Sequence, residues 1–259
     1  MGSARPLSAA LLLCSYPGSS LTISGIEVPH ARETGLSRAL PYRYPDTWPY
    51  SKADLTPEDQ SADQLFYLLP KFVQHAGEEC RQALTDFYDC VLPREGGQVL
   101  DLCSSWTSHY PKGYKAHRVV ALGLNPLELL ANPSMTEWLV QDLNSNPTLP
   151  FENSSFDVIT NALSVDYITQ PLELFAEMHR VLKPGGLCCM AFTNRCFPSK
   201  VVPAWADPFS DLSHVRLVGN YFHFSADWAG TECADVSPPG WLGQRDPMLV
   251  VLARKPGEA

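Results

Sequence analysis

Polar side chains that could bind a small ligand stand within or just after short apolar runs of this 259-residue chain. Runs of this length are typical of buried strands, and an open parallel sheet binds its ligands beyond the carboxyl ends of its strands. A carboxylate or amide there can hydrogen-bond to a polar ligand, and an arginine can hold an acidic group with two parallel hydrogen bonds. The sequence therefore predicts a polar binding site along one sheet edge, built from Asp101, Asn125, Asp142, Asn161 and Arg195.

Four further residues could take a proton from a bound substrate, namely His75, His109, Asp166 and Tyr167. A general base must lie within hydrogen-bond reach of the proton that it removes, and its pKa must suit the reaction. None of the four belongs to a recognisable spacing pattern, so a structural role stays open for each of them. The same alternative, an ordinary exposed loop residue, stays open for Arg195.

The elements that would position these residues alternate between strands and helices. Strands are expected at residues 99–103, 118–123, 138–143, 156–160, 187–192, 232–236 and 248–253, and helices at 171–182 and 208–221. This alternation predicts an α/β fold class with a mostly parallel sheet.

The chain divides into three parts. Residues 1–56 are rich in Pro, Ser and Tyr without lasting periodicity, which predicts an extended arm. Residues 57–95 are expected to form a helical cap, because apolar side chains recur there at helical spacing, and residues 96–259 form the α/β domain. The first 26 residues contain no acid, and residues 7–13 are apolar; a plastid or mitochondrial targeting segment and a disordered tail are both open.

Composition excludes several classes of function. A formal charge of −9 argues against a nucleic-acid backbone as the main partner, and no apolar run approaches the ~18 residues of a membrane helix. The eight cysteines form neither a CxxC pair nor a Cys/His set at zinc spacing. No metal centre is therefore expected, and the thiols indicate a reducing, intracellular location, either cytoplasmic or organellar.

The most specific motif covers residues 149–192, which read LPFENSSFDVITNALSVDYITQPLELFAEMHRVLKPGGLCCMAF. Two apolar runs flank an amphipathic helix closed by Lys-Pro-Gly-Gly, which predicts a strand–helix–strand unit. This motif resembles that of class I S-adenosylmethionine (SAM) dependent methyltransferases, in their small-molecule, type 11-like branch. The residues that match are Leu149, Pro150, Phe151, Ser155, Phe156, Asp157, Glu177, Arg180, Val181, Leu182, Lys183, Pro184, Gly185 and Gly186.

The resemblance implies a Rossmann-like sheet of seven strands with a helical cap, and S-adenosyl-L-methionine as the cofactor. It also implies a set of cofactor contacts at the carboxyl ends of the first four strands. They are Asp101, Cys103, Ser104, Ser105, Asn125, Asp142, Leu143 and Asn161.

The loop after the first strand departs from the family pattern of an acid followed by three alternating glycines. Asp101 is present, whereas the loop that follows it, with Cys103, Ser104 and Ser105, contains none of the glycines that would allow close approach to the ligand. The serines could still turn the chain and contact the amino acid end of SAM; alternatively, the added side chains and Trp106 fill the site and weaken binding. The run from 101 to 111 resembles a narrower methyltransferase-like group with an Asp-Leu-x-Ser-Ser-Trp turn.

The nucleoside contacts are also open to two interpretations. The family places an acid at the ribose hydroxyls, where this chain has Asn125, which could instead cap a helix that begins at Pro126. Asp142 and the Leu143 amide are implied to bind adenine, although Asp142 could simply form a turn.

Two functions follow from these residues. The first is a SAM-dependent methyltransferase acting on a small or medium-sized molecule, with an atypical cofactor loop. The alternative is a non-catalytic methyltransferase-like subunit or assembly factor, which would contact a protein partner through the proline-rich arm.

Overall fold

The computed structural model describes residues 20–206, 210–239 and 247–257. The apolar run at 7–13, and with it any targeting segment, lies outside the described residues, as does the start of the helix expected at 208–221. Among the described helices, none combines the length and apolar character that crossing a bilayer requires.

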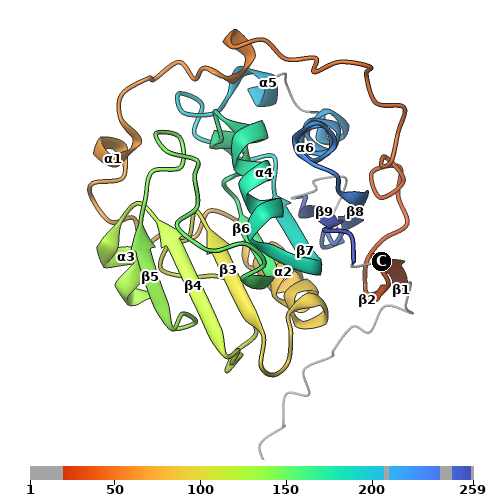
Figure 1. The fold of residues 1–259 in the computed structure, drawn as a ribbon, viewed down its shortest axis with the longest axis horizontal. Helices are drawn as coiled ribbons and strands as arrows, with labels where there is room; N and C mark the ends of the chain where they lie inside the picture. The colour runs from red at the N-terminus through yellow and green to blue at the C-terminus, as the bar shows by residue number, and fades with distance from the viewer. Residues whose placement is uncertain (1–19, 207–209, 240–246, 258–259) are drawn as a thin grey trace, which may run out of the picture.

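Seven strands of the described residues form one sheet, in the order β5-β4-β3-β6-β7-β9-β8 (Figure 1). The strands β3 to β7 are parallel, and β9 lies antiparallel between β7 and β8. The bounds are Gln98–Leu102 (β3), Arg118–Gly123 (β4), Glu137–Val140 (β5), Phe156–Ala162 (β6), Leu182–Phe192 (β7), Ala229–Asp235 (β8) and Leu249–Arg254 (β9). The expected fold class is therefore confirmed.

Helices cover both faces of this sheet. One core cluster joins the sheet to α4 and α6, and a second joins the opposite face to α2. Cys188 belongs to the first cluster and its neighbour Cys189 to the second, as the alternation of a strand requires. The helices are Asp63–Phe66 (α1), Glu78–Val91 (α2), Pro126–Ala131 (α3), Pro171–Val181 (α4), Pro203–Ala206 (α5) and Asp211–Ser225 (α6), with single 3-10 turns at Ala53–Leu55 (η1) and Val165–Tyr167 (η2).

The helix expected at 208–221 continues to Ser225 in α6. Two other boundary differences have identifiable reasons. β5 ends at Val140 instead of residue 143, because Asp142 starts a turn by accepting the amide hydrogens of Asn144 and Ser145. The Lys-Pro-Gly-Gly run does not cap α4 as a turn; α4 passes at Leu182 directly into an irregular start of β7.

The helical cap expected over residues 57–95 is only partly helical. α1 is a single turn, and the chain from Tyr67 to Gly77 is irregular. Pro70 explains this, because it has no N–H to donate and it disfavours helical geometry in the preceding residue. α2 is a regular helix, but it packs against the sheet through side chains such as Leu84 and Phe87 instead of covering the strand ends.

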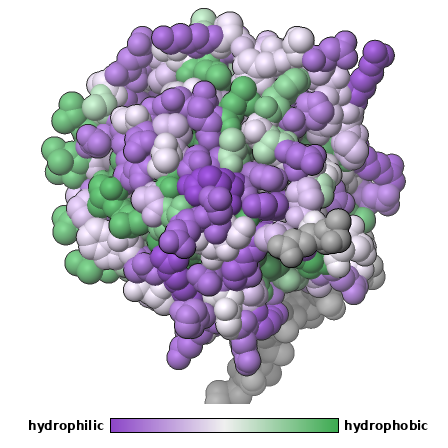
Figure 2. All heavy atoms as spheres, in the orientation of Figure 1, coloured by the Kyte–Doolittle hydropathy of each residue, from purple (hydrophilic) through white to green (hydrophobic). Residues whose placement is uncertain are grey.

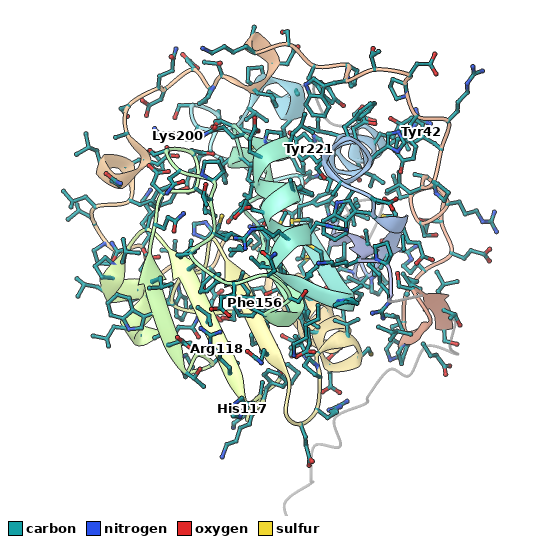
Figure 3. All side chains as sticks on the ribbon, viewed as in Figure 1. Tyr42, His117, Arg118, Phe156, Lys200 and Tyr221 are labelled. Atoms are coloured by element: carbon teal, nitrogen blue, oxygen red, sulfur yellow. The ribbon has the colours of Figure 1, made fainter. Side chains whose placement is uncertain are left out.

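The described part of the arm lies on the domain and curves around it (Figure 1). It begins with a hairpin that was not expected, Ser20–Ile23 (β1) and Ile26–Pro29 (β2). Farther along, the hydroxyl of Tyr42 donates to the Asn220 side chain of α6, and that side chain donates to the hydroxyl of Tyr50. Figure 3 shows Tyr42 next to α6, so this stretch is part of the domain surface.

A buried lysine anchors the segment 59–75, hereafter the cap segment. The side chain of Lys200, labelled in Figure 3, is only 3% exposed. Its ammonium donates to the carbonyl oxygen of Ser61 at 2.6 Å and pairs with Asp63 at 3.1 Å and Asp59 at 3.3 Å. Loss of this charge would leave the carboxylates of Asp59 and Asp63 without their cation and the Ser61 carbonyl without its donor.

The substitution Lys200→Met is expected to lower the free energy of unfolding by about 3 kcal/mol, because it breaks a buried ion pair. Chemical denaturation measures this effect, with Lys112→Met on the exposed loop after β3 as the matched control, expected within about 0.5 kcal/mol of the unsubstituted protein. Equal stability of the two variants would contradict the anchoring role.

Candidate functional site

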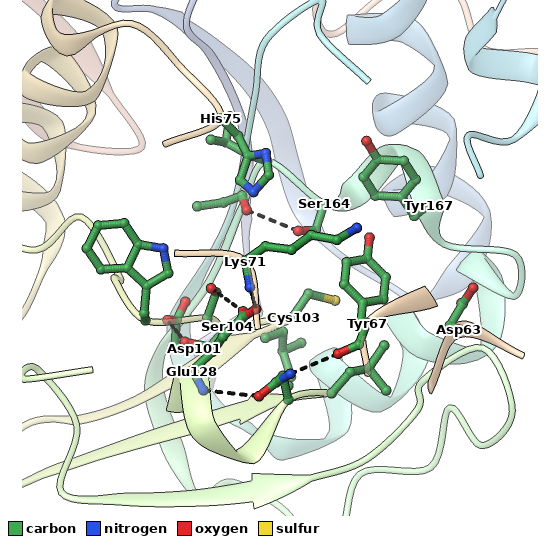
Figure 4. Close-up of a pocket in the computed structure, with 18 of the residues that line it drawn as sticks. Asp63, Tyr67, Lys71, His75, Asp101, Cys103, Ser104, Glu128, Ser164 and Tyr167 are labelled. Atoms are coloured by element: carbon green, nitrogen blue, oxygen red, sulfur yellow. Dashed lines mark hydrogen bonds between the residues drawn. The ribbon is translucent and has the colours of Figure 1, made fainter. Parts of the chain in front are cut away.

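The carboxyl ends of the parallel strands meet at a cavity of about 220 Å³, and the cap segment lines its other side (Figure 4). Eleven of the residues predicted from the sequence line it: His75, Asp101, Cys103, Ser104, Ser105, His109, Asn125, Asp142, Leu143, Tyr167 and Arg195. Asn161 and Asp166 are buried behind the lining. Within the described residues, no cluster of three His, Cys, Asp or Glu side chains could hold a metal ion.

Asp101 organises the loop after β3 and is almost fully buried. One carboxylate oxygen accepts the hydroxyls of Ser104 and Ser108 at 2.6 and 2.7 Å, and the other accepts that of Thr160 at 2.9 Å. Burial raises the pKa of Asp101 to about 6, and the three hydrogen bonds limit that rise by stabilising the ionised form. The carboxylate therefore fixes the loop to the neighbouring strand.

The loop makes its turn without glycine. Cys103 adopts a left-handed conformation with φ of +54°, which costs a non-glycine residue roughly 1–2 kcal/mol. The Ser104 amide donates to the Leu122 carbonyl at 2.8 Å, so the loop lies directly on the end of β4. The glycine that this close approach requires is Gly123 in β4, because a Cβ there would collide with the Ser104 carbonyl oxygen.

Asn125 is the N-cap of α3, one of the two roles that the sequence left open. Its side-chain oxygen accepts the amides of Leu127 and Glu128, and its NH₂ group donates to the carbonyls of Tyr67 and Leu68. These four bonds use the full capacity of an amide side chain. Asn125 thus holds the cap segment and has no group left for a ribose.

Glu128 is a lining residue that the sequence reasoning missed. Its carboxylate is 6% exposed; one oxygen accepts the backbone amide of Lys71 at 2.6 Å and the other accepts the hydroxyl of Ser105 at 2.5 Å. The spacing Asn125-x-x-Glu128 is that of a capping box, which places an acid in the first turn of a helix. That signal could have revealed a carboxylate at the end of β4.

Asp142 and Leu143 lie beyond the end of β5. Asp142 forms the turn that the sequence left open, and it also accepts the hydroxyl of Ser145 at 2.8 Å. The Leu143 amide donates no hydrogen bond within the described part of the chain. Asn144, which sequence reasoning also missed, donates to Asp63 at 2.9 Å and to the carbonyl of Tyr167 at 2.8 Å, and so joins this turn to the cap segment.

Two histidines line the cavity: His75 from the cap segment and His109 from the loop after β3. Burial lowers the pKa of His109 to about 4, and burial followed by the charge of Lys71 lowers the pKa of His75, although Glu128 opposes this. Both imidazoles are therefore neutral at pH 7 and able to accept a hydrogen bond or a proton. Tyr167 is engaged elsewhere, because its hydroxyl accepts the Phe197 amide at 2.8 Å.

Asp166 and Asn161 do not reach the cavity. Asp166 is 3% exposed, one of its oxygens has no hydrogen-bond partner among the described residues, and burial raises its pKa to about 7. Asn161 donates to the Leu102 carbonyl at 3.2 Å across the sheet, and its side-chain oxygen has no partner within the described ranges. Both residues are therefore buried next to the strand ends and do not line the cavity.

Comparison with known proteins finds that part of the chain is similar to methyltransferases. Residues 104–190 match the family model described as "Methyltransferase domain", which confirms the resemblance found in the sequence. Demethylmenaquinone methyltransferase of Lactiplantibacillus plantarum is 28% identical over 134 residues, or 48% of this chain and 56% of that protein. Malonyl-(acyl-carrier protein) O-methyltransferase of Hahella chejuensis is 31% identical over 126 residues, or 44% of this chain and 43% of that protein.

The chain spans about half, or less, of the length of the curated relatives that it matches. Among solved structures, phosphoethanolamine N-methyltransferase 2 of Haemonchus contortus, in complex with S-adenosyl-L-methionine, has a TM-score of 0.50 at 14% identity. The superposition covers 82% of this chain and 61% of that one. At this identity the likeness shows a shared fold alone.

The substitution Gly123→Ala is expected to displace the loop after β3 and to lower the free energy of unfolding by about 1–3 kcal/mol through overpacking. Gly35→Ala is the matched control, because an added Cβ there meets no atom within 4 Å. Urea denaturation of both variants checks the expectation. If Gly123→Ala is as stable as the control, the contact between the loop and β4 is not close.

The substitution Asp166→Asn should remove a loss of folding stability that grows as the pH rises. The pKa of about 7 in the folded protein exceeds the ordinary value of 3.8, so stability is lost as pH rises between these values. The variant should therefore exceed the unsubstituted protein by roughly 2–4 kcal/mol at pH 8, with the difference vanishing near pH 4. Chemical denaturation between pH 4 and pH 8 tests this expectation, and Asp86→Asn at an exposed position is the control. A stability difference that does not change with pH would contradict the raised pKa of Asp166.

Proposed function

We propose that the protein is a SAM-dependent methyltransferase acting on a small or medium-sized molecule. The observation that carries the proposal is the position of the cavity, at the carboxyl ends of β3, β4 and β6 in a chain whose residues 104–190 match a methyltransferase domain. In an open α/β sheet this edge is the ligand side. Bound SAM would supply an electrophilic methyl group on its sulfonium sulfur.

The lining residues offer hydrogen-bonding groups for each part of SAM. The Leu143 amide, which has no partner in the described residues, and the remaining acceptor capacity of Asp142 would bind the adenine. Glu128, instead of Asn125, would accept the ribose hydroxyls, because its carboxylate retains acceptor capacity while the amide of Asn125 is saturated. The Ser105 amide, which has no partner in the described residues, would bind the amino acid end.

The acceptor would lie between the cap segment and the loops after β6 and β7. His75 and His109 line the cavity and are neutral at pH 7; His75 is the better candidate to receive the proton, because a pKa of about 4 makes His109 a weak base that would mainly accept a hydrogen bond. Methyl transfer is an in-line displacement that depends mainly on positioning, so the cap segment would orient the acceptor and exclude water. The relative named after demethylmenaquinone is consistent with an acceptor of modest size, whereas the name of the other relative includes an acyl-carrier protein.

A second candidate, a methyltransferase-like subunit that binds a protein partner, is favoured by an exposed apolar surface. In Figure 2 apolar residues gather at the left, where Figure 1 shows α1, α3 and β5. This surface includes an edge strand, which could pair with a strand of another chain. Its members are Leu65, Leu68, Leu69, Phe72, Val73, Leu127, Leu130, Trp138, Leu139 and Val140. The described part of the arm, expected from the sequence to provide this contact, packs on its own domain.

Calorimetric titration with S-adenosylhomocysteine tests the leading proposal. The unsubstituted protein should bind it, and Glu128→Gln should bind about tenfold more weakly, because a charge-assisted hydrogen bond to the ribose is lost. Asn125→Asp retains the capping oxygen but loses the two hydrogen bonds to the carbonyls of Tyr67 and Leu68, so it should loosen the cap segment and also weaken binding.

Ser105→Ala is the matched control for Glu128, because it removes the same internal hydrogen bond and leaves the carboxylate in place. An equal loss of affinity in Ser105→Ala and Glu128→Gln would assign Glu128 a structural role only. No binding of S-adenosylhomocysteine or SAM by the unsubstituted protein at millimolar ligand would reject the methyltransferase proposal and favour the protein-binding subunit.

A further inference from the structure

One cation of the cavity has no carboxylate to neutralise it. The side chain of Lys71 lines the cavity and extends across it in Figure 4. Among the described residues its ammonium forms no ion pair, whereas buried Lys200 has two acidic partners. An ammonium carries three donors that seek acceptors.

The position of Lys71 is set by the protein backbone. Glu128 accepts the Lys71 amide at 2.6 Å, and Asn125 holds the preceding carbonyls of Tyr67 and Leu68. Glu128 is therefore bonded to the backbone of Lys71 and does not neutralise its side chain. The same contacts keep the root of the side chain at the cavity wall.

Three aromatic rings hold the ammonium of Lys71. Its Nζ lies 3.7 Å from the ring centre of Phe66, 4.8 Å from that of Phe197 and 5.1 Å from that of Tyr67. Aromatic faces attract a cation but neither cancel its charge nor accept strong hydrogen bonds. They leave Lys71 oriented and positively charged inside a partly desolvated cavity.

The carboxylates that line the cavity are already engaged by donors of the chain. Asp63 accepts from Asn144 and Lys200, and Asp101 accepts three hydroxyls. Glu128 and Asp142 likewise accept hydrogen bonds from neighbouring residues. Apart from Asp63, these carboxylates have neutral donors and keep their charge, but each oxygen already accepts a hydrogen bond. Among the described residues, the ammonium of Lys71 has no ion pair and no hydrogen-bond acceptor, so its donors are available to a ligand.

We infer that Lys71 binds an acidic group, a carboxylate or a phosphate, of the methyl acceptor. The inference rests on the proposed function, because it names the substrate class of the same cavity. The ammonium would leave the rings of Phe66 and Phe197 only slightly to donate to the anion, and the rings would then cover the apolar part of the acceptor next to it. Lys71 is thus a substrate-positioning residue and takes no part in the transfer of the methyl group.

The test measures binding of small anions to the full chain, with and without saturating S-adenosylhomocysteine. Malonate and inorganic phosphate are the probes for the two acidic groups, and choline is the probe of opposite charge. Lys71→Met should weaken binding of the preferred anion by at least about tenfold, and Lys71→Arg should keep it within about threefold. Lys112→Met, on an exposed loop outside the cavity lining, is the matched control and should change nothing.

Each alternative outcome decides the question. If neither anion binds the unsubstituted protein, or if Lys71→Met binds it equally well, the inference is overturned. Binding of choline in preference to the anions, strengthened in Lys71→Met, would also overturn it and would assign the rings to a cationic acceptor. Anion binding that depends on Lys71 in a protein that binds no S-adenosylhomocysteine would support the anion site and reject the proposed methyltransferase function alone.

Discussion

The arrangement of the site depends on the buried carboxylate of Glu128, which joins three separate parts of the chain. It stands in the first turn of α3 and accepts hydrogen bonds from the loop after β3 and from the backbone of the cap segment. A carboxylate in this position must be bonded, because burying it without donors would cost several kcal/mol. The requirement that its oxygens be satisfied therefore keeps the cap segment over the strand ends and Lys71 at the cavity wall.

The loop after β3 shows how a turn that is rich in glycine in related proteins can be built from larger residues. Cys103 bears the strain of a left-handed conformation, and the hydroxyls of Ser104 and Ser108 bind Asp101 and offset that cost. The space that a glycine would have provided in the loop is provided by Gly123 on the neighbouring strand. In this protein the position that must be glycine is therefore Gly123 in β4, and not a residue of the loop that contacts it.

The cap segment has little structure of its own and is held by polar contacts instead of a core. Lys200, Asn125 and Glu128 fix its backbone at three points, while Leu65 and Leu69 face solvent. A segment anchored by a few specific bonds can open at lower cost than one that shares the main core. Such a segment suits a site that must admit a ligand and then exclude water, and its exposed apolar surface is also the place where a partner could bind.

The sequence by itself determined the approximate positions of the sheet strands, the mostly parallel character of the sheet and the edge at which polar residues gather, because apolar runs and their spacing reflect which side chains must be buried. The sequence also indicated two roles each for Asn125 and Asp142, a cofactor contact or a local cap or turn, but it could not choose between the two roles. Only the tertiary structure decided that Asn125 is saturated by the cap segment, that Glu128 reaches the cavity and that Lys71 lies there without an acidic partner. The bonds from Asn125 and Glu128 to the cap segment join residues more than 50 positions apart, and local sequence pattern carries no information about which distant groups will satisfy one another's hydrogen bonds.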